Sequence, residues 1–204
     1  MIWDYDGTLV ETRFADEEAV SRIVAREPTI AAGAEAFRAT EGWPILDRLE
    51  LAWPGRGLEF LPLFNEPHPP RIFRGVGRTV LQLHARGFGL AVVSSRRSAN
   101  VEWGLGVTGI RHLFSRVIGL DDVHEPKPDP EGLELALGAL RVQPSRAVYI
   151  GDSELDLEAG HRAGMTAWRA TWAGPRIGGN TPLLVRTPHQ VLDRLDHTQP
   201  ARSA

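Results

Sequence analysis

The chain has 204 residues, enough for one core domain with a modest insertion, and 42% of them are hydrophobic and 24% charged. The net charge of −3, with no basic stripe, argues against a nucleic-acid partner. The absence of cysteine excludes disulfides and thiolate metal sites. No apolar run approaches 18 residues, and the N-terminus shows no signal-peptide pattern, so we expect a cytoplasmic protein with no membrane partner, either a monomer or a homodimer.

The chain opens with an apolar run that ends in an acidic turn. Residues 1–3 (Met-Ile-Trp) predict a buried strand, and residues 4–8 (Asp-Tyr-Asp-Gly-Thr) predict a tight turn. Gly7 suits a backbone conformation that other residues resist. Two carboxylates, Asp4 and Asp6, therefore follow directly on the first strand.

The spacing of apolar residues is helical from about Arg13 to Arg71. One helix is predicted around Val20, a second follows Pro44, and a shorter one covers Leu58–Phe64. Residues 65–70 (Asn-Glu-Pro-His-Pro-Pro) predict a stiff linker. Because this helical block interrupts the pattern that follows it, we interpret residues 13–71 as a small helical cap inserted after the first strand.

Buried strands and helices alternate after the linker. Strands are predicted at 89–93, 117–119, 147–150 and 166–170, a helix near Asn100–Phe114, a loop to Pro182, and a last strand and helix over Leu183–Leu195. This alternation predicts an α/β fold with a doubly wound parallel sheet, a Rossmann-like core. The core would comprise residues 1–12 and 72–196, with a flexible tail at 197–204.

Polar side chains gather where the predicted strands end, and ligands of such sheets bind at that edge. Carboxylates, a hydroxyl and one ammonium are costly to bury without a ligand, but together they complement a divalent cation and a phosphate. Arginine fills 22 of the 23 basic positions, and the single lysine lies in a proline-rich loop that can reach the same edge. The residues concerned are Asp4, Asp6, Ser94, Lys127, Asp152 and Asp156.

In chain order these residues resemble the four motifs of the haloacid dehalogenase superfamily, in its phosphoglycolate-phosphatase-like branch. The matching stretches are Asp4–Val10, Leu90–Ser95, Lys127–Pro130 and Gly151–Asp156. The resemblance covers nearly all of residues 1–195 and is thin within the cap. It implies a phosphoric monoester hydrolase that acts on a small phosphorylated metabolite with Mg²⁺ as cofactor.

The resemblance also implies roles for the acidic residues. Asp4 would be the nucleophile, and Asp6 would protonate the leaving oxygen and later activate the attacking water. Mg²⁺ would be held by the Asp4 side chain, the Asp6 backbone carbonyl and Asp152, because this hard cation prefers oxygen ligands. An acid at position 6 argues for phosphoryl transfer, since a halide leaves without needing a proton.

The remaining matching residues would bind the phosphate. Lys127 would neutralise a phosphate oxygen, and Ser94 would donate a hydrogen bond, with its neighbour Ser95 as the alternative donor. Asp156 would orient Lys127 or a metal-bound water. Four cap residues could contact the leaving group, although a structural role is favoured for each of them. They are Arg38, Trp43, Arg48 and Trp53.

Three other functions are alternatives to a phosphatase. A phosphomutase would use the same core chemistry and return the phosphoryl group to a sugar. A receiver-type signalling domain also uses acids, a hydroxyl, a lysine and Mg²⁺, but in a different chain order and without a helical insertion. A catalytically degenerate binding protein would not need the complete set of motifs.

Overall fold

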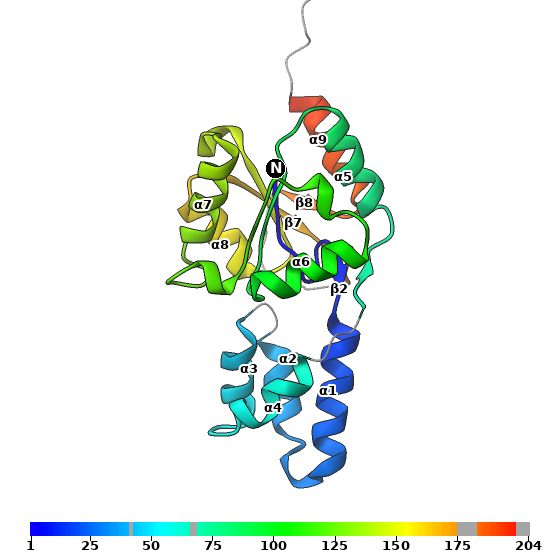
Figure 1. Cartoon of the computed structure of the whole chain (residues 1–204), viewed down its shortest axis with the longest axis vertical. Helices are drawn as coiled ribbons and strands as arrows, with labels where there is room; N and C mark the ends of the chain where they lie inside the picture. Colours follow the sequence, from blue (N-terminus) through cyan, green and yellow to red (C-terminus); the bar gives the residue numbers. More distant parts are fainter. Residues whose placement is uncertain (41–42, 66–68, 175–182, 199–204) are drawn as a thin grey trace, which may run out of the picture.

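The computed structural model describes residues 1–40, 43–65, 69–174 and 183–198, which form an α/β core and a helical unit beside it (Figure 1). The core sheet has six strands in the order β5-β4-β1-β6-β7-β8, and every neighbouring pair is parallel. This arrangement confirms the predicted α/β fold class. The strands are β1 (Ile2–Trp3), β4 (Ala91–Val93), β5 (Arg116–Ile118), β6 (Val148–Gly151), β7 (Thr166–Ala170) and β8 (Leu184–Val185).

Helices cover both faces of the sheet and bury two separate apolar clusters. One face carries α5 (Val76–Ala85), α6 (Ser98–Val107) and α9 (His189–Thr198), and the other carries α7 (Glu131–Leu140) and α8 (Glu154–Arg162) (Figure 1). Successive strand side chains alternate between these faces, so Ile2 and Trp3 lie in different clusters, and neither is exposed. Among the described residues, no helix combines the length and apolarity that a membrane span needs.

Several predicted boundaries differ from the structure. The helix predicted near Asn100–Phe114 ends at Val107, because Gly109 adopts a left-handed φ of 76° and the chain continues into a short 3₁₀ turn. Helix α9 continues to Thr198, so it extends two residues into the segment predicted as a tail, after Leu195 packs against the core. Parts of the predicted linker (66–68), loop (175–182) and tail (199–204) lie outside the described residues.

Strand β1 is short but holds the central position. It pairs with β4 on one side and β6 on the other, with Ile2 opposite Ala91 and Tyr149. The backbone N–H of Asp4 then donates to the Ile150 carbonyl at 2.8 Å. The first residue after the strand is therefore fixed by the sheet itself.

The helical unit is inserted through a pair of neighbouring strands. Strands β2 (Val10–Glu11) and β3 (Arg71–Ile72) are antiparallel, with Val10 opposite Ile72. The chain thus leaves and re-enters the core at adjacent points, immediately after the Asp4–Asp6 turn. Between them lie α1 (Arg13–Arg26), α2 (Gly33–Ala39), α3 (Ile45–Ala52) and α4 (Gly57–Phe64) (Figure 1).

The cap has an apolar core of its own. Phe37 stacks near Trp53 and Phe64, with ring centroids 6.1 and 5.0 Å apart, and the indole of Trp53 donates to the Ile30 carbonyl at 3.0 Å. Leu49, which is not exposed, belongs to the same cluster. The cap is therefore a packed unit that can present a stable surface to the core.

Replacing Leu49 with alanine should lower the free energy of unfolding by about 2–5 kcal/mol, since the cap core would lose buried methyl groups and gain a cavity. Leu51→Ala, on the same helix, should change it by less than about 0.5 kcal/mol because Leu51 is 53% exposed. Urea denaturation followed by tryptophan fluorescence would measure both. Equal effects of the two substitutions would contradict this account of the cap core.

Candidate active site

The site lies where three neighbouring strands end. Because β1 lies between β4 and β6, Asp4 at the end of β1 has Ser94 beyond one neighbouring strand and Asp152 beyond the other. All three side chains are buried. The structure therefore brings these sequence-predicted residues to one edge of the sheet.

Lys127 reaches this edge from the loop between β5 and α7. Its ammonium donates to Asp4 Oδ1 at 2.8 Å and to Asp156 Oδ1 at 2.7 Å, and it lies 3.4 Å from the Tyr149 hydroxyl. The Lys127 side chain is only 7% exposed. A buried ammonium between two buried carboxylates is stable because each charge compensates another.

Asp156 is fully engaged by hydrogen-bond donors. Its Oδ1 accepts from Lys127 and from the Tyr149 hydroxyl at 2.8 Å. Its Oδ2 accepts from the Ser153 backbone N–H at 3.0 Å and the Ser153 hydroxyl at 2.6 Å. Four donors occupy the lone-pair positions of this carboxylate, so the geometry suits orientation of Lys127 better than coordination of a cation.

Burial and neighbouring charges both shift the pKa values of this cluster. Burial raises the pKa of Asp4 well above its ordinary value, with Asp156 and Asp152 adding to the rise and Lys127 opposing it. Burial alone would lower the pKa of Lys127, but Asp156 and Asp4 outweigh it and raise that pKa. Burial alone would raise the pKa of Asp156, yet Lys127 and Ser153 hold it below the usual range.

A divalent cation fits beside this cluster. One carboxylate oxygen from each of Asp4, Asp152 and Asp156 lies within 4.8 Å of the others, and all three residues are buried. The oxygens of Asp156 already accept four hydrogen bonds, so Asp4 and Asp152 are the better metal ligands of the three. A hard cation takes such oxygen ligands, and its charge would oppose the rise in the pKa of Asp4.

Gly7 makes room for Asp152. It has a left-handed φ of 73°, and a Cβ built on it would lie 2.0 Å from Asp152 Oδ2. Only glycine therefore lets the turn after β1 pass so close to this carboxylate. Glycine is therefore required at position 7 for two reasons: the left-handed backbone conformation, as predicted, and the absence of a side chain beside Asp152.

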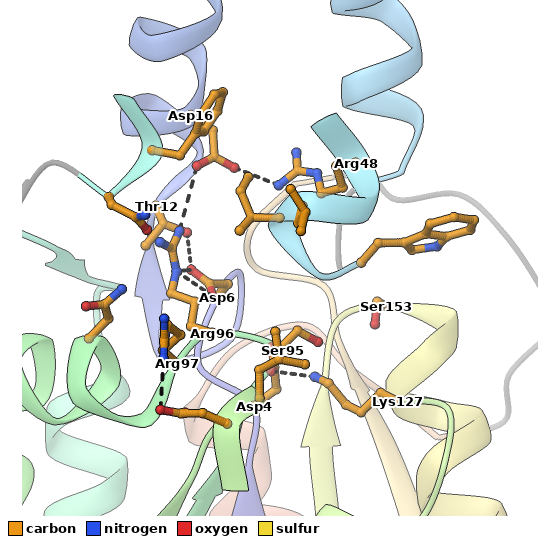
Figure 2. A pocket seen from close by; sticks show the side chains of 18 of the residues that line it. Asp4, Asp6, Thr12, Asp16, Arg48, Ser95, Arg96, Arg97, Lys127 and Ser153 are labelled. Atoms are coloured by element: carbon orange, nitrogen blue, oxygen red, sulfur yellow. Dashed lines mark hydrogen bonds and ion pairs between the residues drawn. The ribbon is translucent and has the colours of Figure 1, made fainter. Parts of the chain in front are cut away.

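Asp6 faces away from the lysine cluster, toward an arginine (Figure 2). Arg96 Nε donates to Asp6 Oδ1 and Oδ2 at 2.8 and 2.9 Å, and the Thr12 hydroxyl donates to Oδ1. Arg96 also lies 3.7 Å from Asp16 of α1, which binds Arg48 of α3 at 2.8 Å. A chain of alternating charges thus runs from the core turn into the cap.

The two predicted serines have different surroundings. The Ser94 hydroxyl is buried and accepts the backbone N–H of Arg96 at 3.1 Å. Ser95 lines the cavity of about 290 Å³ that contains Asp4 and Lys127, and both serines line a smaller pocket beside Lys127. Both Ser94 and Ser95 therefore remain candidates for donating a hydrogen bond to the phosphate.

Two of the four cap residues weighed from the sequence line the large cavity. Trp43 and Arg48 do so, whereas Trp53 is buried in the cap core. Arg38 is exposed and forms an ion pair with Glu17 at 2.6 Å. Arg48 also stacks on Phe37, 3.8 Å from the ring centroid, so it is structural as well as site-lining.

Sequence reasoning missed Arg96, Thr12 and Tyr149. Arg96 had a usable signal, because it follows the Ser94–Ser95 pair at the end of a predicted strand. Tyr149 looked like any apolar residue of a core strand, although its hydroxyl reaches the lysine cluster. Thr12 carried no signal, since its partner depends on where the cap begins.

A comparison with protein-family models identifies the family. The haloacid dehalogenase-like hydrolase model matches residues 1–170. The chain belongs to that family. The predicted superfamily and the prediction that the chain is a hydrolase are therefore confirmed.

Sequence relatives cover the chain to different extents. Pyrophosphatase PpaX of Anoxybacillus flavithermus is 30% identical over 201 residues, covering 96% of this chain and 92% of that protein. Pyrophosphatase PpaX of Listeria welshimeri is 39% identical over 123 residues, which covers 60% of this chain and 55% of the relative.

Solved structures share the fold at lower identity. A haloacid dehalogenase-like hydrolase from Streptococcus pneumoniae matches with a TM-score of 0.80 at 17% identity, covering 95% and 96% of the two chains. CbbY from Rhodobacter sphaeroides, in complex with xylulose-(1,5)bisphosphate, matches with a TM-score of 0.73 at 23% identity, covering 90% and 92%. At these identities the matches establish the fold alone.

Gly7→Ala should sharply raise the concentration of Mg²⁺, measured by isothermal titration, that is needed to half-saturate this candidate site, because the new methyl group would displace Asp152. Gly55→Ala is the matched control, since Gly55 also has a left-handed φ (77°) but a Cβ built on it would meet nothing within 4 Å. Both variants carry the same backbone strain of about 1–2 kcal/mol, so only the steric effect on Asp152 differs. Equal metal requirements in the two variants would contradict the role given to Gly7.

Proposed function

We propose that the chain is a Mg²⁺-dependent phosphatase that hydrolyses a small phosphate monoester through an aspartyl-phosphate on Asp4. The observation that carries the proposal is the placement of the Asp4 carboxylate, buried in a cavity and 2.8 Å from the Lys127 ammonium. Attack of a carboxylate on a phosphate brings two anions together, and a fixed cation at that point reduces their repulsion.

In the first half-reaction, Asp4 forms a bond to phosphorus while the bond from phosphorus to the leaving oxygen breaks. Asp6 gives its proton to that oxygen. In the second, Asp6 removes a proton from water as the water attacks the same phosphorus, which releases phosphate and restores Asp4. Lys127 and Ser94 or Ser95 hold the phosphate oxygens throughout.

The metal would be held by Asp4, Asp152 and the backbone carbonyl of Asp6. When bound, it supplies positive charge that orients the phosphate and reduces repulsion between the substrate and the carboxylates. Asp156 takes no part in bond making. Its two oxygens fix the position of the Lys127 ammonium and the first turn of α8.

Asp6 has to exchange partners before it can act as an acid. Its carboxylate accepts hydrogen bonds from Arg96 and Thr12, and neither group can take part in proton transfer to the substrate. We therefore assign the structure to a state in which Arg96 and Thr12 hold Asp6 away from the substrate. Substrate entry has to be followed by rotation of Asp6 toward the leaving oxygen.

The relatives suggest the first substrates to assay. The PpaX proteins are named pyrophosphatases, so pyrophosphate belongs in the panel beside phosphoglycolate and sugar monophosphates. Isomerisation of sugar monophosphates should be followed in parallel with phosphate release. Isomerisation faster than release would favour the phosphomutase alternative.

Asp4→Asn should lower kcat by at least roughly a thousandfold, because the amide is nearly the same size but is not a nucleophile. Glu154→Gln is the matched control, since Glu154 is exposed at the start of α8 and pairs with Arg169. It should retain most of the activity. Phosphate release and circular dichroism would be measured for both, and an active, folded Asp4→Asn protein would remove Asp4 as the nucleophile.

Chelation of divalent cations should abolish phosphate release, and added Mg²⁺ should restore it. The reason is that Asp4 and Asp152 lie together in a buried site with an excess of carboxylates. Isothermal titration with Mg²⁺ alone gives an independent readout. Full activity in excess chelator would contradict the proposed cofactor.

A further inference from the structure

The cavity above Asp4 has a chemically divided lining. Its base carries Lys127 and the carboxylates that follow the core strands, whereas the cap contributes the Asp16–Arg48 ion pair and an apolar surface, which we name the cap wall. The cavity holds about 290 Å³, so it admits a phosphate and a small leaving group. The cap wall consists of Trp43, Ile45, Leu46, Leu61 and Phe64.

The cap wall includes large apolar side chains that the protein itself does not cover. Trp43 is 44% exposed and Leu46 is 37% exposed, although both lie on a cap with a well-packed core. Exposed apolar side chains that converge on a cavity can be covered by an apolar part of a ligand. The phosphate end of the substrate is fixed by Lys127, so the leaving group is the part that meets the cap wall.

The cations deep in this cavity are already engaged by carboxylates. Arg48 is 7% exposed and binds Asp16 at 2.8 Å, and Arg96, which Asp6 would release when it turns toward the leaving oxygen, also lies 3.7 Å from Asp16 (Figure 2). A second anionic group would have to break one of these ion pairs and leave a carboxylate uncompensated. Such a substrate would bind at a disadvantage.

The overall charge of the lining points the same way. Among the described residues, six aspartates and four basic side chains line the cavity. The two extra carboxylates would balance the charge of one Mg²⁺ ion, so the lining has no surplus cation for a second anionic group. Arg97 has the loosest pairing, 3.7 Å from Asp121, and its side chain is 71% exposed. An anionic group that reached Arg97 would stay in solvent, where an ion pair contributes little.

We propose that the substrate is a phosphate monoester whose leaving alcohol is uncharged and carries an apolar or aromatic part that packs on the cap wall. This inference rests on the proposed phosphatase function and narrows it. The phosphate binds at Asp4 and Lys127, and the cap selects the alcohol by apolar contact. Pyrophosphate and phosphoglycolate, which carry a second anionic group, are poorer substrates.

The test compares leaving groups of matched size on the Mg²⁺-loaded enzyme. Values of kcat/KM would be measured for ethyl, propyl and butyl phosphate, 2-phosphoglycolate and pyrophosphate. Propyl phosphate should exceed 2-phosphoglycolate, which has a similar length, by at least tenfold. Each added methylene should raise kcat/KM by up to about fourfold.

The outcomes separate this inference from the function on which it rests. A higher kcat/KM for pyrophosphate or 2-phosphoglycolate than for the alkyl esters would overturn the inference and leave the phosphatase function standing. Hydrolysis of none of the five compounds would overturn the proposed function, and the inference would fall with it.

A pair of variants locates the selectivity on the cap. Leu46→Arg adds a cation to the cap wall and should raise the ratio of kcat/KM for pyrophosphate over propyl phosphate by about tenfold. Leu51→Arg is the control, since Leu51 lies on the same helix, is 53% exposed and does not line the cavity. It should leave the ratio unchanged, and circular dichroism would confirm that both variants fold. An unchanged ratio in Leu46→Arg would also overturn the inference.

Discussion

The candidate site depends on one interaction, the buried contact of the Lys127 ammonium with Asp4 and Asp156. Without this cation, two carboxylates would share a buried edge of the sheet with Asp152 close by, which is unfavourable at neutral pH. Asp156 is fixed in turn by Ser153 and Tyr149, so the ammonium has one position. The sheet supplies the position of Asp4, and this network supplies its charge environment.

The cap adds a second arrangement of charges that reaches the same turn. Arg96 binds Asp6 and lies near Asp16, and Asp16 holds Arg48 of the cap. The part of the cavity that would receive a leaving group is thus walled by neutralised charges and apolar cap side chains. Under the proposed function, the core would bind and activate the phosphate while the cap would select the alcohol.

Much of this arrangement could be predicted from the sequence. Apolar runs that stop at polar residues placed Asp4, Ser94 and Asp152 at strand ends, and parallel strands bring such ends to one edge. The single lysine among the basic residues pointed to Lys127. These predictions depend on the parallel direction of the strands, which alternating helices and strands indicate well, whereas the strand order was not predicted. The catalytic roles themselves stay predictions.

Other features could not be predicted, for physical reasons. The partner of Asp6 depends on side-chain rotamers and on how the cap sits on the core, neither of which local spacing encodes. Asp16 and Arg48 are 32 residues apart and meet only through cap packing. Strands β2 and β3 have two residues each, too short for a detectable period. The sequence pattern marks Tyr149 as an ordinary core residue, and only the three-dimensional structure shows that its hydroxyl contacts Lys127 and Asp156.

The most direct test of the central claim is to trap the covalent intermediate. Substrate labelled in the phosphoryl group would be mixed with the Mg²⁺-loaded protein, quenched in acid, and the labelled peptide mapped by mass spectrometry. We predict a label on Asp4 that forms much more slowly in Lys127→Met, because the methionine keeps the bulk and removes the charge. Phosphate release without a label on Asp4, or labelling at an unchanged rate in Lys127→Met, would contradict the account.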